Sequence, residues 1–213
     1  MHIPDAFIPL PQAAVYWIAA IIFLALAIRW ARSEFNEDKI PLIAVLAAGI
    51  FALQSFNLPV SMGTSGHLVG GALAAIVLGS PFAAVFILTL VLIIQGFIFG
   101  DGGITVMGAN ILNMGVIGGF VGYYSFQGLL KILKNPYISS AVAAWLACLI
   151  PSLACAVEMY VAGTFPLVPG LVAMGLYHAI IGVIEGIVTA VIIYVLLMAR
   201  PDLVETSVGV ASA

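Results

Sequence analysis

The sequence is poor in charged residues. Asp, Glu, Lys and Arg account for 7% of the 213 residues, whereas hydrophobic residues account for 64%. Soluble domains contain about 25% charged residues, so the composition excludes a soluble domain. It predicts an all-α integral membrane protein, because a helix satisfies its own backbone hydrogen bonds within the bilayer.

Two further absences narrow the functions open to the chain. The phosphate-binding pattern G-x-x-x-x-G-K-[ST] does not occur, so ATP hydrolysis by that route is excluded. The two cysteines, Cys148 and Cys155, lack the paired spacing of a zinc site. They lie on roughly one helical face, and we interpret them as small packing residues within lipid rather than as a disulfide or a thiolate metal site.

Long apolar runs are abundant. A helix needs about 20 residues to cross a bilayer core of about 30 Å. Runs bounded by charged residues, prolines and glycine clusters predict about seven transmembrane helices, of which the third is short. The expected spans are residues 12–29, 40–57, 67–79, 81–99, 104–127, 138–161 and 170–199.

The basic residues predict the orientation. With seven spans all of them fall on one side of the membrane, which the positive-inside rule makes the cytoplasmic side. The N-terminus is then outside, and it lacks the features of a cleaved signal peptide. Met1 is therefore expected to be kept. The basic residues are Arg29, Arg32, Lys39, Lys131, Lys134 and Arg200.

Met1 and His2 form the most informative pair of residues. The free α-amine of Met1, the amide nitrogen of His2 and the His2 imidazole can close two fused chelate rings on one metal ion. A deprotonated amide favours square-planar Ni(II) or Cu(II), and imidazole suits Ni, Cu, Co and Zn rather than Mg or Ca. His67 is expected on the same face, where it would supply a fourth nitrogen. An interfacial imidazole bonded to a carbonyl or a headgroup is the alternative for His67.

Other polar residues are expected near these ligands. Asp5 bonds an amide of the N-terminal segment, orients an imidazole, or is a solvated loop residue, and Ser65 lies in the same glycine-rich loop as the second histidine. Asn110 and Asn113 share one face of a predicted helix and serve either as partners of the ligands or as hydrogen-bonding groups between helices. Asp101 is interpreted as a turn or cap residue rather than as a ligand.

The last span carries two buried polar residues. His178 and Glu185 lie two turns apart on one face and are interpreted as a structural pair, with a role on the ion path as the alternative. Small residues also repeat at four-residue spacing, which permits close helix contact inside the bundle and, for some, with a membrane partner. These repeats are Gly115 with Gly119, Gly118 with Gly122, Gly182 with Gly186, and Ala143 with Ala147.

Four segments form one specific combination that covers nearly the whole chain. They are Met1-His2-Ile3-Pro4-Asp5, Ser65-Gly66-His67-Leu68-Val69-Gly70-Gly71, Phe99-Gly100-Asp101-Gly102-Gly103-Ile104-Thr105 with Asn113-Met114-Gly115, and residues 178–186. Together they resemble the CbiM/NikM family, the substrate-binding (S) components of energy-coupling-factor importers for cobalt and nickel. Ala6 departs from the family pattern, which has glycine there; the ligand chemistry is unaffected.

The resemblance implies a transport component in the plasma membrane of a prokaryote. It would capture Ni²⁺ at the extracellular face through the Met1 amine, the amide and imidazole of His2, and His67. The same role for Co²⁺, supplying cobalamin biosynthesis, is the alternative. The implied partners are a transmembrane coupling subunit, cytoplasmic ATPase subunits and, as an option left open, a small additional membrane subunit; nucleic acid is not expected.

The whole chain, residues 1–213, is therefore expected to be one domain. Residues 1–11 would be the metal-binding segment, residues 12–199 the helical bundle and residues 200–213 a cytoplasmic tail. A membrane metalloenzyme is disfavoured, because four nitrogens in a plane leave no equatorial position for a substrate. A self-contained secondary carrier is disfavoured because the sequence shows no inverted repeat.

Overall fold

The computed structural model is nearly all-helical, and it describes residues 1–60 and 64–204. Its helices and strands are α1 (Leu10–Glu34), α2 (Ile40–Gln54), β1 (Leu58–Val60), β2 (Thr64–Gly66), α3 (Gly71–Val77), α4 (Pro81–Ile94), α5 (Met107–Asn110), α6 (Gly118–Leu133), α7 (Pro136–Val161) and α8 (Leu167–Ala199). Two π-helical segments, η3 (Gln95–Phe99) and η4 (Ile111–Ile117), extend α4 and join α5 to α6. The short 3-10 helices η1 (Glu37–Lys39) and η5 (Pro201–Leu203) follow α1 and α8.

Capping side chains set where two of the long helices begin. Asn135 caps α7 by accepting the backbone amides of Tyr137 and Ile138, both at 3.0 Å. Ser80 caps α4 through the amide of Phe82 at 3.2 Å. Both helices carry proline in the first turn, where the missing amide has no helical partner to lose.

The long helices present an apolar surface. Five stretches are long and apolar enough to cross a membrane, namely Leu10–Glu34, Pro81–Phe99, Met107–Leu133, Pro136–Val161 and Leu167–Ala199, while Ile40–Gln54 is shorter. On α8 the buried face carries the polar His178, Glu185 and Thr189. Polar groups turned inward and apolar side chains turned outward suit a helix in lipid. The exposed side chains of α8 include Val168, Val172, Leu176, Ile180, Ile184, Ile187 and Val191.

The prediction for the third span was wrong in its secondary structure. Residues 67–79 do not form one helix: α3 has only seven residues, about 10 Å at 1.5 Å per residue, against a bilayer core of about 30 Å. The hairpin of β1 and β2 precedes it, with Leu58 opposite Gly66, so the chain is not strictly all-α. Gly70 adopts a left-handed φ of 77° and starts α3. Such irregular backbone is tolerated at membrane depth where protein surrounds it, and all seven residues of α3 are buried.

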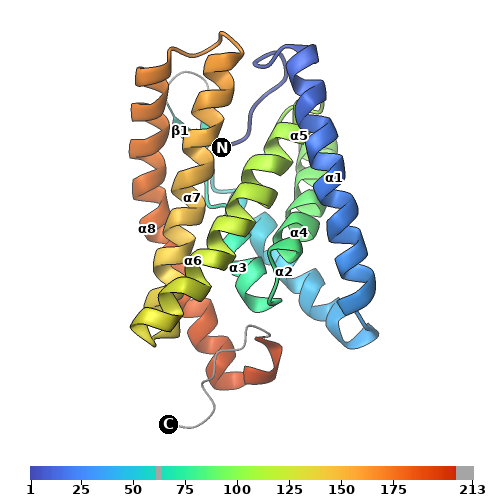
Figure 1. The fold of residues 1–213 in the computed structure, drawn as a ribbon, viewed down its shortest axis with the longest axis vertical. Helices are drawn as coiled ribbons and strands as arrows, with labels where there is room; N and C mark the ends of the chain where they lie inside the picture. The colour runs from blue at the N-terminus through green and yellow to red at the C-terminus, as the bar shows by residue number, and fades with distance from the viewer. Residues whose placement is uncertain (61–63, 205–213) are drawn as a thin grey trace.

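The long helices run along the bundle, and the short α3 lies among them. Figure 1 shows α7 and α8 side by side along one edge, α1 along the opposite edge, and the short α3 between them. The C-terminal ends of α1, α6 and α8 lie at the same end of the bundle (Figure 1). The six basic residues fall in or next to these ends, so they lie on one side of the bundle as the sequence predicts.

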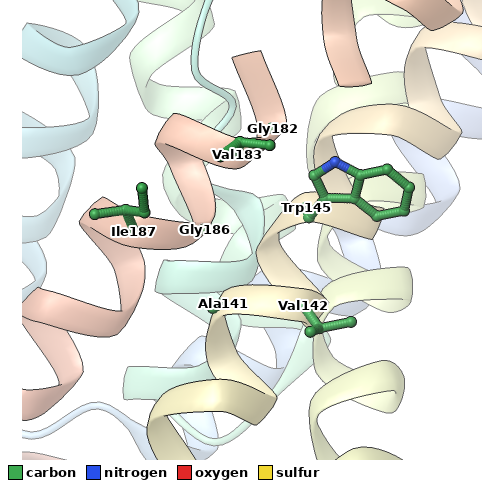
Figure 2. Close-up of a pocket in the computed structure, with 7 residues that line it drawn as sticks. All are labelled: Ala141, Val142, Trp145, Gly182, Val183, Gly186 and Ile187. Atoms are coloured by element: carbon green, nitrogen blue, oxygen red, sulfur yellow. The ribbon is translucent and has the colours of Figure 1, made fainter. Parts of the chain in front are cut away.

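The small-residue repeats mostly serve contacts within the bundle. A Cβ atom on Gly122 of α6 would lie 2.7 Å from the Cα atom of Ala72 in α3, and one on Gly186 of α8 would lie 2.7 Å from the carbonyl oxygen of Ala141 in α7. Figure 2 shows the groove between α7 and α8 at this level, about 250 Å³ in volume. Trp145 and Val142 from α7 border it together with Gly182 from α8 (Figure 2). The glycines therefore bring α8 against α7.

We expect Gly122→Ala to destabilise the fold and Gly128→Ala, on the same helix, to leave it intact. The first adds a methyl group against the backbone of α3, and overpacking of this kind costs about 1–3 kcal/mol. The second meets nothing within 4 Å and removes a glycine from a helix interior, which is mildly favourable. Thermal unfolding of the detergent-purified variants measures both effects. Equal melting temperatures would contradict the packing of α6 on α3.

Candidate metal centre

The first three residues form a plug buried inside the bundle. Met1 and Ile3 are fully buried and His2 is 3% exposed; Figure 1 shows the N-terminus within the outline of the bundle. Asn110 holds this plug: it accepts the Ile3 amide at 2.9 Å and donates to the Ile3 carbonyl at 3.2 Å. The Gly103 amide donates to the same carbonyl at 2.9 Å. The side chain of Asn110 thus pairs with the plug as a neighbouring strand would.

Burial leaves the N-terminal amine mostly neutral. The amine donates to the carbonyl oxygen of Ser65, and the hydroxyl of Ser65 lies 3.5 Å from it. Desolvation lowers the pKa of the Met1 amine to about 5, because a charged ammonium loses its hydration when it is buried. At pH 7 the nitrogen therefore has a lone pair available for a metal.

The two imidazoles lie face to face beside this amine. The rings of His2 and His67 are stacked, with centroids 4.4 Å apart and planes 25° apart. Nδ1 of His67 lies 2.7 Å from the carbonyl oxygen of Leu68, so Nδ1 carries the proton and Nε2 the lone pair. Within the described residues, Nε2 of each ring has no hydrogen-bond partner although both are buried. Burial lowers the pKa of both imidazoles, which keeps the rings neutral.

Asp101 belongs to this site, contrary to its interpretation as a turn residue. Its Oδ1 lies 3.1 Å from Nδ1 of His2, and its Oδ2 accepts a hydrogen bond from Asn57 at 3.0 Å. The interaction with His2 lowers the pKa of the Asp101 carboxyl. Gly102, with a left-handed φ of 88°, brings the turn close: a Cβ atom there would lie 3.2 Å from Cδ2 of His2. In the sequence, the glycines on both sides of Asp101 indicate that the turn can come close to a neighbouring segment.

Asp5 holds a loop rather than an imidazole. Its carboxylate accepts the amide of Thr105 at 2.8 Å, the amide of Ile104 at 3.2 Å and the hydroxyl of Thr105. The hydroxyl bond is the main reason that the pKa of Asp5 is lowered. One of its predicted roles was to bond an amide of the N-terminal segment. The structure shows that Asp5 does bond backbone amides, but these belong to the segment before α5.

Asn110 and Asn113 have different surroundings despite their predicted common face. Asn113 donates to Oε2 of Glu158 in α7 at 2.7 Å, away from the N-terminal plug. Gln12 of α1 donates to the backbone carbonyl of Glu158 at 2.9 Å. Asn113 and Glu158 therefore form a polar contact between helices, which is one of the two roles predicted for Asn113.

The expected pairing of His178 with Glu185 is not formed. Glu185 accepts the amides of Val69 and Gly70, both at 2.8 Å, whereas Nδ1 of His178 bonds the carbonyl oxygen of Met174 at 2.8 Å. Each side chain bonds a different backbone segment, because α8 packs against the segment that leads into α3, and Nε2 of His178 is buried without a hydrogen-bond partner among the described residues. His178 borders the site all the same, since a Cβ atom on Gly66 would lie 3.8 Å from its Cε1.

Side chains alone do not make a metal site in residues 1–60 and 64–204. This part of the chain contains no group of three or more His, Cys, Asp and Glu side chains placed to hold a metal ion. Cys148 and Cys155 are buried and free. The further nitrogen beside His2 and His67 is the buried amine of Met1.

Comparisons with known proteins point to metal transport. The family described as "Cobalt uptake substrate-specific transmembrane region" matches residues 2–203. A Haloquadratum walsbyi protein named for metal transport is 40% identical over 97% of this chain and 94% of its own length. The fused nickel transport protein NikMN of Rhodobacter capsulatus is 35% identical (95% and 63%), and the cobalt transport protein CbiM of Geobacter sulfurreducens is 34% identical (100% and 64%).

A solved structure supports the same relationship. The crystal structure of a truncated transition metal transporter superposes with a TM-score of 0.88 at 33% identity, covering 93% of this chain and 99% of that one. A second crystal structure of a transition metal transporter gives the same TM-score and covers 93% of both chains. The helix arrangement described above is thus shared with transporters of transition metals.

We expect Asn110→Ala to release the N-terminal plug and Asn113→Ala, on the same helical stretch, to leave it in place. Only the first removes both hydrogen bonds between Asn110 and Ile3, which leaves the buried Ile3 amide without its partner at a cost of about 1–3 kcal/mol. Acylation of the Met1 amine at pH 7, followed by mass spectrometry with exposed Lys131 as internal reference, should be faster in Asn110→Ala alone. The same labelling rate in both variants would contradict the role of Asn110.

Proposed function

The chain belongs to the family of transmembrane regions that determine the substrate in cobalt uptake, and we propose that it captures Ni²⁺ as the substrate-binding component of an energy-coupling-factor importer. The proposed ligands are the Met1 amine, the amide nitrogen and Nδ1 of His2, and Nε2 of His67. The observation that carries this proposal is the buried, mostly neutral N-terminal amine beside two stacked imidazoles, of which His67 has a buried Nε2 without a hydrogen-bond partner among the described residues.

The size of the chelate rings determines which nitrogens of Met1 and His2 can bind the same ion. Amine and amide of consecutive residues close a five-membered ring, and the amide with Nδ1 of His2 closes a six-membered ring. Nε2 of the same imidazole is too remote to share an ion with its own amide. Nδ1 of His2 faces the Asp101 carboxylate in this structure. Metal binding at Nδ1 therefore requires that the contact between His2 and Asp101 be broken.

Charge balance favours the same assignment. Ni²⁺ with one deprotonated amide has a net charge of +1, and the Asp101 carboxylate beside His2 supplies the opposite charge. An uncompensated charge in a buried site is costly. We therefore assign Asp101 the role of a counter-charge next to the ligand set.

Nickel is preferred over cobalt on the chemistry of the donors. A deprotonated amide among four nitrogens is a strong-field set, which favours low-spin square-planar Ni(II). Relatives of this chain are named for nickel transport and for cobalt transport. Co²⁺ is accordingly the alternative substrate of the same site.

The energy for import is assigned to other subunits. The chain lacks the G-x-x-x-x-G-K-[ST] loop, so the proposed complex includes a transmembrane coupling subunit and cytoplasmic ATPases. The end that carries the basic residues faces the cytoplasm of a prokaryotic cell under the positive-inside rule. The N-terminal plug then opens toward the outer face, where the ion is captured.

The decisive experiment moves the amine. One residue inserted before Met1 leaves both histidines in place but removes the amine from the chelate, and we expect nickel affinity to fall by at least about a hundredfold, beyond the cost typical of a residue outside the ligand set. Nickel K-edge absorption should change from a planar four-nitrogen shell to one of higher coordination with oxygen. Intact mass confirms the N-terminus of each sample. Unchanged affinity in an uncleaved extended protein would refute the ligand set.

We expect His67→Ala to weaken nickel binding strongly and His178→Ala to weaken it much less. Both rings are buried and both use Nδ1 to bond a backbone carbonyl, but only His67 is a proposed ligand. Calorimetric titration with nickel measures the two affinities, and thermal unfolding verifies the fold. Equal losses in two folded variants would move the site toward α8.

A further inference from the structure

The segment that carries His67 is held from two helices by buried side chains. Glu185 of α8 accepts the amide of Val69 through Oε2 and the amide of Gly70 through Oε1, both at 2.8 Å. Gln54 of α2 donates to the carbonyl oxygen of Val69 at 2.7 Å. Gln54 is fully buried and Glu185 is 3% exposed. Both peptide groups that flank Val69 are thus fixed from opposite sides.

Glu185 and Gln54 together form a clamp on residues 69–70. The clamp is linked to the imidazole of His67 through the peptide group between Leu68 and Val69. The ring of His67 donates to the carbonyl of Leu68 at 2.7 Å, and that carbonyl belongs to the peptide group whose amide bonds Glu185. The direction of Nε2 therefore depends on a backbone that Glu185 orients. Two parallel hydrogen bonds to one carboxylate fix orientation as well as distance.

We propose that Glu185, with Gln54, is a positioning residue for His67, which on the proposed function is the nickel ligand that the N-terminal segment does not supply. The three nitrogens of Met1 and His2 are joined covalently and keep their spacing. The fourth nitrogen comes from another part of the chain, so its distance from the other three is set by noncovalent contacts. Glu185 provides two of these contacts, because its two oxygens each accept one backbone amide.

The chain offers a matched control in Glu158. This residue is also a glutamate on a long apolar helix, α7, but its side chain accepts a hydrogen bond from Asn113 and not from the backbone of the segment that carries His67. Glu158→Gln preserves an oxygen for Asn113. Glu185→Gln preserves an oxygen for only one of its two amides and turns an NH₂ group toward the other, so the segment must shift.

The test is a double-mutant cycle on the purified full chain with nickel alone as the probe. We expect Glu185→Gln to weaken binding about ten- to a hundredfold, the range for residues that orient metal ligands, and to replace one nitrogen of the nickel shell by oxygen in X-ray absorption. In the His67→Ala background the same substitution should have little further effect, because the ligand it positions is gone. Glu158→Gln should match the unsubstituted protein.

The outcomes separate this proposal from the one on which it rests. Equal losses from Glu185→Gln with and without His67, or a retained four-nitrogen shell at full affinity, overturn the positioning role and leave the ligand set standing. A nickel shell other than four nitrogens in the unsubstituted protein overturns the ligand set itself. If Glu185→Gln fails to fold, Gln54→Met removes only the hydrogen bond to the Val69 carbonyl. A loss of nickel affinity of a few fold that disappears in the His67→Ala background supports the positioning role. A loss of the same size in both backgrounds overturns it.

Discussion

The pairing of Ile3 with Asn110 determines where the N-terminal amine lies. A chain terminus is ordinarily mobile and solvated, and a charged ammonium resists burial. Here the backbone amide and carbonyl of Ile3 both bond the side chain of Asn110, so Ile3 enters the bundle with its backbone hydrogen bonds made. The amine and the His2 ring are then carried to fixed places beside residues 65–67.

This arrangement buries the nitrogens of Met1, His2 and His67. Their burial determines their protonation state. Because burial lowers the pKa of the amine and of both imidazoles, their neutral forms prevail. The ligand set needs no acidic cluster, and none of three or more metal-binding side chains occurs in the described residues. A centre of this kind discriminates against hard ions such as Mg²⁺, which prefer oxygen.

The sequence predicts the helices well and the contacts of the site less well. Apolar runs locate the long helices within a few residues, and the resemblance to the cobalt and nickel uptake family is confirmed. The third span failed because a glycine-rich segment with mixed polarity shows neither helical nor strand periodicity. Asn110 and Asn113 were assigned one face on α-helical spacing, but η4 is π-helical and its wider turn separates them. Glu185 bonds backbone amides, which carry no signal in a sequence.

Ile3 and Asn110 are far apart in the sequence, and this separation constrains the order in which the protein folds. Ile3 is among the first residues to leave the ribosome, yet its partner lies 107 residues later. The plug cannot be seated until α1, α2, α3 and α4 are inserted and α5 has followed them. Contacts of such long sequence separation are slow to form, so the N-terminus is buried only after much of the bundle has assembled. Completion of the proposed ion-binding site is therefore a late event in biogenesis, which requires the helices up to α5 to be in place.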